Sequence, residues 1–445
     1  MNIIMNLQSI YTRTGISTRV FRSILLFFTG LIIFTQISVF PQPASAITFT
    51  TNSVRPIDVL DYEALGYRYD TLSIQGSNTN LKVRKNAARL TSNEISRFVN
   101  AVLNLKKTMV KGTDGTPISI YDQFVATHLG SFDVTGRIDS NGDSFANPGH
   151  MGDAFLPWHR EFLHQFEHVL QIVDPTVTVP YWDYTDRNAT QNIIFQNNFI
   201  GPNGGTSGIG GGSVQSGFFS AANGWLQRKD LSGKTWVGKS TETQPLTRRL
   251  RGFTNLPTTA QVDDTLSKTT YRDFRSSIER VTHNNAHLWV GGSISNVGTS
   301  PNDPIFWMLH ANIDRIWAEW QVDGHWGSNW YPANSGFYGH SLNDMMWPWD
   351  QGQMTAAADL QALIPTQLSV EAKNRPSPGS VEFKIASSLE ELMSDRTGHL
   401  YNPFASNTQH EMHDNMLCDG DISSDMQCEN NSDNIAAISS MLPPA

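Results

Sequence analysis

The chain has 445 residues, of which 39% are hydrophobic and 16% are charged. This balance is typical of a globular protein with a substantial core, in one large domain or two ordinary ones, and it excludes disorder for most of the chain. The formal net charge is −9, and a surface of this sign is a poor match for nucleic acid, so no nucleic-acid partner is expected.

The N-terminal residues 1–46 have the order of a secretory signal. Three arginines without an acidic residue precede the eighteen-residue run SILLFFTGLIIFTQISVF, and the small residues ASA follow. This order predicts a signal peptide that is cleaved after Ala46, and therefore an exported protein, periplasmic or extracellular. An uncleaved membrane anchor is the alternative, because the apolar run nearly spans a bilayer. Cleavage would leave 29 basic and 41 acidic residues, a net charge of −12.

The segment 81–107 predicts an amphipathic helix that begins at Thr91 or Ser92. Glu94 follows at the spacing of a capping box. Apolar residues then recur at helical intervals, at Ile95, Phe98, Val99, Val102 and Leu103.

Residues 150–168, HMGDAFLPWHREFLHQFEH, contain four of the 13 histidines. Proline at the first helical position loses no hydrogen bond, which predicts a helix that starts at Pro157. On this helix His159 shares the apolar face, whereas His164 and His168 lie about 140° and 180° away. We therefore expect His159 to face the core, as a satisfied core histidine or a metal ligand, and the other two to be solvated.

Four further histidines have spacings that fit a metal site. His128 ends a short predicted helix, and a second segment, HNNAHLWVGG, places His283 and His287 one helical turn apart. The glutamate of a zinc-protease motif is absent, because Asn284 follows His283. His310 lies on the inner face of the predicted helix that follows the turn-forming Asn-Asp-Pro.

Together with His159 and the loop residue His150, these four histidines form two groups of three. Neither group has a cysteine or a convincing carboxylate. Structural zinc prefers four ligands, usually with cysteine, and di-iron bundles use glutamates. Sites built from three imidazoles favour copper and leave room for an exogenous molecule.

The quoted motifs resemble the type 3 copper family of tyrosinases, catechol oxidases and haemocyanins. The matching segments are FLPWHREFL, PYWDYTD at 180–186, HNNAHLWVGG, and SPNDPIFWMLHANIDRIWAEW at 300–320. The resemblance covers roughly residues 80–350. It departs from the family at Leu309, where the family often has a histidine. No cysteine lies near His150, so the thioether link of some branches cannot form, and the chain looks more like the bacterial branch.

The resemblance implies a mostly α-helical fold in which a four-helix bundle holds a dinuclear copper centre, with long loops and a C-terminal tail. The implied ligands of the first copper ion are His128, His150 and His159, and those of the second are His283, His287 and His310. The expected organisation is a signal peptide at 1–46, a copper-binding domain at 47–350 and a C-terminal extension at 351–445.

The implied activity is that of a tyrosinase, which hydroxylates monophenols and oxidises o-diphenols to o-quinones with dioxygen. Family members that hydroxylate carry a glutamate and an asparagine that hold a water for the phenolic proton. Glu279 and Asn284 match these positions. The alternatives are a solvated Glu279, and an Asn284 that only caps the helix or orients His283.

Three other functions stay open for the sequence. They are an oxidase confined to o-diphenols or o-aminophenols, a haemocyanin-like dioxygen carrier, and a catalytically inactive copper-binding protein in which Leu309 disrupts the second copper site. The expected partners are small phenols, catechols and dioxygen, with a copper-delivery protein as a candidate and the oligomeric state undetermined.

The extension 351–445 is expected to be partly ordered and to shield the active site, with Tyr401 or Phe404 as a plug. Truncation after about residue 350 should then raise activity. Cys418 and Cys428 are expected to form a disulfide in an exported chain, and two free thiols are the alternative.

Overall fold

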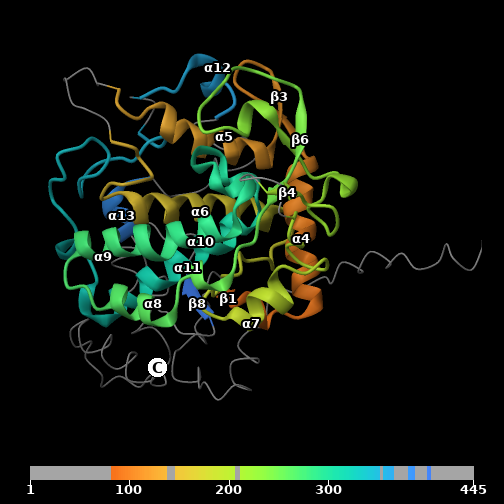
Figure 1. Cartoon of the computed structure of the whole chain (residues 1–445). Coiled ribbons are helices and arrows are strands. Elements are labelled where there is room, and N and C mark those ends of the chain that lie inside the picture. Colours follow the sequence, from red (N-terminus) through yellow and green to blue (C-terminus); the bar gives the residue numbers. More distant parts are fainter. Residues whose placement is uncertain are drawn as a thin grey trace, which may run out of the picture. The chain divides into compact units, whose positions relative to one another are not determined.

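The computed structural model describes residues 82–137, 146–205, 211–350, 354–364, 379–385 and 398–401. The predicted signal peptide, Phe404 and the two cysteines lie outside these residues. The described part is mostly helical (Figure 1), which confirms the predicted fold class. None of its helices combines the length and the apolar character that a membrane crossing requires.

The helices and strands are short relative to the chain, and long loops join them. The helices are α4 (Ser92–Lys107), α5 (Ile120–Asp133), α6 (Phe155–Val173), α7 (Arg187–Ala189), α8 (Thr259–Leu266), α9 (Tyr271–Ser277), α10 (Asn284–Val290), α11 (Ile305–Trp320), α12 (Ala358–Gln361) and α13 (Val381–Ile385). The strands form antiparallel pairs: β1 (Lys82–Lys85) with β8 (Gly398–Tyr401), β2 (Met109–Lys111) with β3 (Pro117–Ser119), β4 (Gly212–Ser213) with β7 (Thr247–Arg248), and β5 (Leu226–Arg228) with β6 (Thr243–Pro245).

The histidine-bearing elements are α5, α6, α11 and the continuous helical stretch 271–290, in which a π-helical segment, Ile278–His283, joins α9 to α10. Figure 1 shows α5, α6 and α11 at successive levels of the bundle, and α4 packs against both α5 and α6. The predicted capping box is confirmed, because Thr91 and Glu94 cap α4 reciprocally. Helix α6 begins at Phe155 rather than at Pro157, which still lies in the first turn, where a backbone N–H has no intrahelical partner.

Helix α6 is buried on almost every side, contrary to the amphipathic pattern expected from the sequence. His164 is only 1% exposed, so its prediction as a solvated residue is wrong. The pattern fails because α4, α11 and α13 all pack on this helix. Four tryptophans also lie in this core, each at most 1% exposed: Trp307, Trp317, Trp320 and Trp347.

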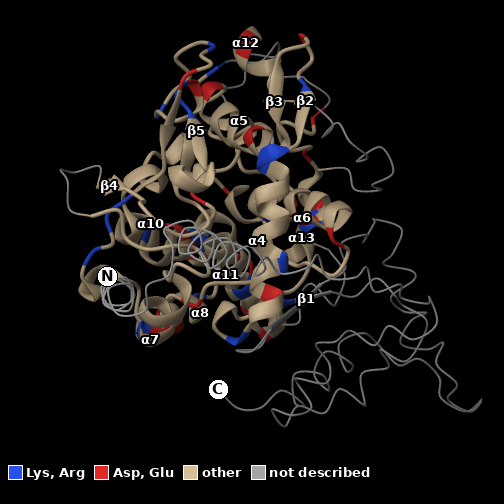
Figure 2. Ribbon diagram, turned by 90° about the vertical axis from the view of Figure 1, so that its right-hand side faces the viewer, with Lys and Arg blue, Asp and Glu red and all other residues tan. Residues whose placement is uncertain are grey.

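Charged residues are spread over the described helices (Figure 2). The side chains of several of them are fully buried. Arg84 on β1 pairs with Glu167 of α6 at 2.9 Å and with Asp314 of α11 at 2.8 Å. Arg160 of α6 pairs with Asp314 at 2.5 Å. Because buried charges are costly without partners, this network fixes α6, α11 and β1 relative to one another.

Segments beyond residue 350 also pack against the bundle. Leu360, Leu363 and Ile364 in and after α12 are fully buried, and so is Val381 of α13. Lys384 of α13 forms an ion pair with Glu161 of α6. The described C-terminal segments therefore contribute side chains to the core that supports the histidines.

Candidate metal centre

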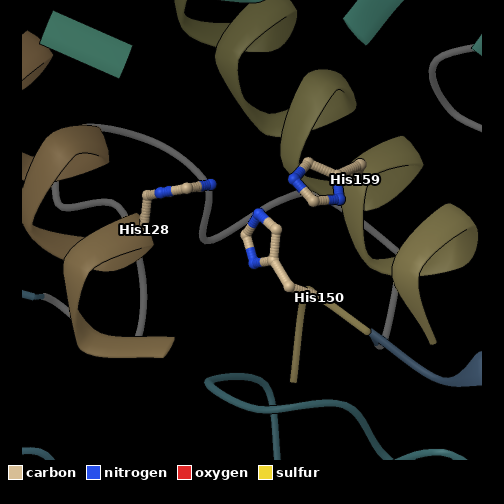
Figure 3. Close-up of side chains that lie close together, drawn as sticks. All are labelled: His128, His150 and His159. Carbon is tan, nitrogen blue, oxygen red and sulfur yellow. The ribbon is translucent and has the colours of Figure 1, made fainter. Parts of the chain in front are cut away.

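The structure brings His128, His150 and His159 together in one buried cluster (Figure 3). His128 comes from α5, His159 from α6, and His150 from the loop that joins these helices. The ring of His150 lies between the other two in the close-up. One nitrogen from each ring lies within 4.8 Å of the other two, so this first cluster could hold a metal ion.

The hydrogen bonds of the first cluster determine which ring nitrogen of each histidine is unprotonated. Each Nδ1 faces an oxygen: Gly298 O at 2.9 Å for His128, Asn147 Oδ1 at 3.2 Å for His150, and Phe155 O at 2.9 Å for His159. Because these oxygens accept, each Nδ1 carries the proton and each Nε2 presents a lone pair. The Nε2 atoms of His128 and His159 are buried without a hydrogen-bond partner in the structure. Orphaned lone pairs of this kind fit a bound cation.

His283, His287 and His310 form the second cluster, again with the three nitrogens within 4.8 Å of one another. His283 Nε2 lies 3.0 Å from His287 Nε2 and 3.2 Å from His310 Nε2. Two imidazole nitrogens bound to one ion at about 2.0 Å would lie about 3.3 Å apart in tetrahedral geometry. The spacing therefore fits three ligands around one ion. Leu309 is fully buried beside His310 and does not displace it from the cluster.

The two clusters are adjacent. His159 of the first stacks on His310 of the second, with ring centroids 4.1 Å apart and planes 10° apart. Phe155 and Phe306 pack against rings from both clusters. The six histidines therefore surround one apolar, dinuclear centre.

Burial keeps these imidazoles neutral. It lowers the pKa of His128 to about 3 and of His287 to about 4, and it holds the pKa of the other four well below the ordinary value. A neutral imidazole is the form that binds a metal. With no sulfur or carboxylate in either set, the donors fit copper.

Glu279 lies in the π-helical segment one turn before His283 and is 4% exposed. Its Oε1 accepts the backbone N–H of Met151 at 2.6 Å, and its Oε2 accepts Nη1 of Arg275 at 3.3 Å. Burial raises the pKa of this carboxyl group. The structure thus places Glu279 as a buried group that joins the second-cluster helix to the residue after His150, whereas sequence reasoning had also considered a solvated side chain.

Asn284 is exposed, and its Oδ1 lies 2.9 Å from Nδ1 of His283. This contact orients His283, in agreement with the alternative role considered above. Solvent also reaches the side chains that follow two of the other histidines, since Met151 is 75% and Leu288 48% exposed. The centre therefore approaches the surface where Met151, Asn284 and Leu288 lie.

Sequence reasoning missed two residues that hold the His150 loop, Asn147 and His340. The role of Asn147 could have been predicted, because Asn-Pro-Gly is a turn sequence and His150 follows three residues after this asparagine. His340 Nδ1 accepts the N–H of Ala154 at 3.1 Å across 186 residues of sequence. No local pattern reveals a contact of this range.

Comparisons with known proteins show what this chain is similar to. The model of the common central domain of tyrosinase matches residues 118–323. A tyrosinase from Streptomyces antibioticus is 37% identical over 293 residues, which cover 63% of this chain and 97% of the relative. A grixazone synthase from Streptomyces griseus subsp. griseus is 34% identical over 274 residues, 54% of this chain and 84% of the relative. A solved polyphenol oxidase from Thermothelomyces thermophila is 24% identical, with a TM-score of 0.46 and coverage of 60% and 77%.

Proposed function

Because this chain belongs to the tyrosinase family, we propose that it hydroxylates monophenols at the ortho position and oxidises o-diphenols to o-quinones. The chain is a copper-dependent oxidoreductase that acts on phenols with dioxygen, and two copper ions are its cofactors. The observation that carries the proposal is the stacking of His159 on His310, which joins two three-histidine clusters into one centre. We assign the six histidines as the copper ligands, three to each ion.

The two copper ions, when bound, supply the electrons and the coordination site through which dioxygen oxidises a phenol. The chain orients five of the six ligands, all but His310, through contacts of their Nδ1 atoms. Phe155 and Phe306 pack against rings of both clusters and make the centre apolar. A phenol with a pKa near 10 is about one part in a thousand ionised at pH 7, a handicap of roughly 4 kcal/mol. We assign Glu279, through a water that Asn284 helps to hold, as the group that receives the phenolic proton.

Replacement of Glu279 by glutamine tests this assignment. A glutamine keeps an oxygen that can accept the N–H of Met151, but it cannot take a proton. We expect hydroxylation of tyrosine to fall about 10²-fold or more in kcat/KM, the lower range for a lost general base. Oxidation of a catechol should fall much less. An equal loss of both activities would show instead that Glu279 only supports the centre, and unchanged hydroxylation would remove it from the reaction.

A second candidate is an oxidase confined to o-diphenols or o-aminophenols. It is favoured by the bonds that already engage Glu279 with Met151 and Arg275, and Asn284 with His283. The relatives bear the names tyrosinase and grixazone synthase at similar identity, so membership of the family leaves the phenol open. Tyrosine hydroxylation measured with a trace of catechol decides between the two, and its complete absence would refute the monophenol activity.

We also propose that the chain is exported by its N-terminal residues 1–46. The support is the order of arginines, apolar run and Ala-Ser-Ala in the sequence. N-terminal sequencing of the protein from cell fractions should give Ile47 as the first residue outside the cytoplasm. Retention of residues 1–46 in a membrane fraction would favour the anchor.

The last proposal is that part of the C-terminal extension shields the centre. Truncation after residue 350 is a poor test, because α12, α13 and β8 pack against the bundle or pair with β1. Deletion of 402–445 keeps every described element. We expect this deletion to raise catechol oxidation, whereas unchanged kinetics in a copper-loaded deletion variant would dismiss shielding.

A further inference from the structure

The six histidines differ in what holds them. Five lie on helical segments, whose backbone fixes the direction of each Cβ, whereas His150 lies in the loop before α6. A loop ligand needs other restraints to keep its ring nitrogen aimed at the partner histidines. The described part of this loop, 146–154, contains such restraints.

Two side chains, those of Glu279 and His340, contact the backbone of the loop just after His150. Met151 has a left-handed φ of 57°, and its N–H donates to Glu279 Oε1. Gly152 lies against the ring of His340, because a Cβ there would come within 2.3 Å of that ring. The N–H of Ala154 donates to the same ring. These contacts place the Cα of His150, but they leave its ring free to rotate.

The ring itself is held by Asn147. The side chain of Asn147 is 3% exposed, and its Oδ1 accepts from the N–H of Gly149 at 2.9 Å and from Nδ1 of His150 at 3.2 Å. The backbone donor identifies this atom as the amide oxygen, since an NH₂ group could not accept it. His128, His159 and His287 instead use backbone carbonyls for the same purpose.

We propose that Asn147 is a positioning residue for His150: it fixes the proton on Nδ1 and turns Nε2 toward His128 and His159, so that occupancy of the first copper site depends on it. A partner of this kind sets the tautomer and the basicity of a metal-binding imidazole. The proposal rests on the assignment of the first cluster as a copper site. It does not depend on which phenols are oxidised.

The test compares two variants at position 147 with a matched control. N147L has a similar volume but no acceptor, and N147D keeps an acceptor for both donors. The control is N203L, because Asn203 Oδ1 also accepts two donors, the N–H of Gly205 two residues later and the N–H of Leu250, and neither donor belongs to a histidine. Copper per chain is measured after gel filtration with EDTA, together with circular dichroism and the electron paramagnetic resonance signal of the oxidised proteins.

We expect two copper ions per chain in the wild type, in N147D and in N203L. N147L should retain about one, which gives the signal of a lone cupric ion, because a coupled pair is silent. The affinity of its first copper site should fall about 10–100-fold, in line with the loss of such a partner from other metal sites. Two retained copper ions in N147L would overturn the proposal, as would copper loss from N147D, or equal copper loss from N147L and N203L. The copper count needs no phenol, so it can fail independently of the proposed function.

Discussion

The ion pair between Lys384 and Glu161 makes the C-terminal segment part of the support of the metal centre. Lys384 Nζ lies 2.5 Å from Glu161 Oε2, and the two side chains are 1% and 0% exposed. Arg160 Nη1 donates to the backbone oxygen of Lys384 at 3.1 Å. Arg160 and Glu161 directly follow His159 on α6, so α13 is attached at the turn that carries His159, which we assign as a copper ligand.

Replacement of Lys384 by methionine leaves a carboxylate buried beside an apolar chain. Removal of one partner of a buried ion pair costs about 3–5 kcal/mol. With an unfolding entropy of about 2.1 cal/mol/K per residue, a domain of roughly 300 residues loses about 5–8 °C in Tm. The double variant E161Q/K384M should recover at least half of this loss, because neither charge is then left without its partner.

The assay is thermal unfolding of the copper-loaded protein, followed by circular dichroism at pH 7. The control is K229M, since the pair of Lys229 with Glu242 is exposed, at 49% and 69%, and should contribute about 1 kcal/mol or less. Two results would show that this buried pair does not attach α13 to α6. One is a K384M variant with the same Tm as K229M. The other is an E161Q/K384M variant whose Tm lies below that of the wild type by the sum of the losses of E161Q and K384M.

Three further predictions concern the loop of His150 and the metal. Burial lowers the pKa of His340 to about 4, whereas the pKa in the unfolded chain is about 6.5. The contribution of His340 to the stability of the fold is therefore complete above pH 6.5, and about 3 kcal/mol of it is lost as the pH falls through 4. Because glutamine does not titrate, the difference in unfolding free energy between the wild type and H340Q, measured with urea, should shrink by this amount over the same range. G152A should lower copper occupancy because its Cβ would meet the ring of His340, whereas G252A, where a Cβ has open space, should match the wild type in copper analysis. Removal of copper with a chelator should lower the Tm, and added copper but not magnesium should restore it. The reason is that a ligand at a thousand times its Kd stabilises the folded state by about 4 kcal/mol. An unchanged Tm after copper removal would contradict a structural contribution of the metal.

The amino-acid pattern was sufficient for the parts of this protein that depend on local geometry. The capping box at Thr91 and the inward face of His159 follow from helical periodicity, and the structure has both. The burial of His164 could not be predicted, because it depends on α13, which is more than 200 residues away in the sequence and covers the face that periodicity assigned to solvent. The same reason hides His340, whose contact with the loop spans 186 residues.

The bond between Glu279 and Met151 connects the two halves of the centre. Glu279 belongs to the helical stretch that carries His283 and His287, yet it holds the backbone next to His150. This carboxylate therefore contacts the backbone beside the first cluster and belongs to the helical stretch that carries the second, and Arg275 adds a second link because it pairs with both Glu279 and Asp153. A buried carboxylate whose geometry depends on both clusters is placed correctly only when both are assembled. Proton transfer by Glu279 would then be confined to the protein in which all six histidines are in position.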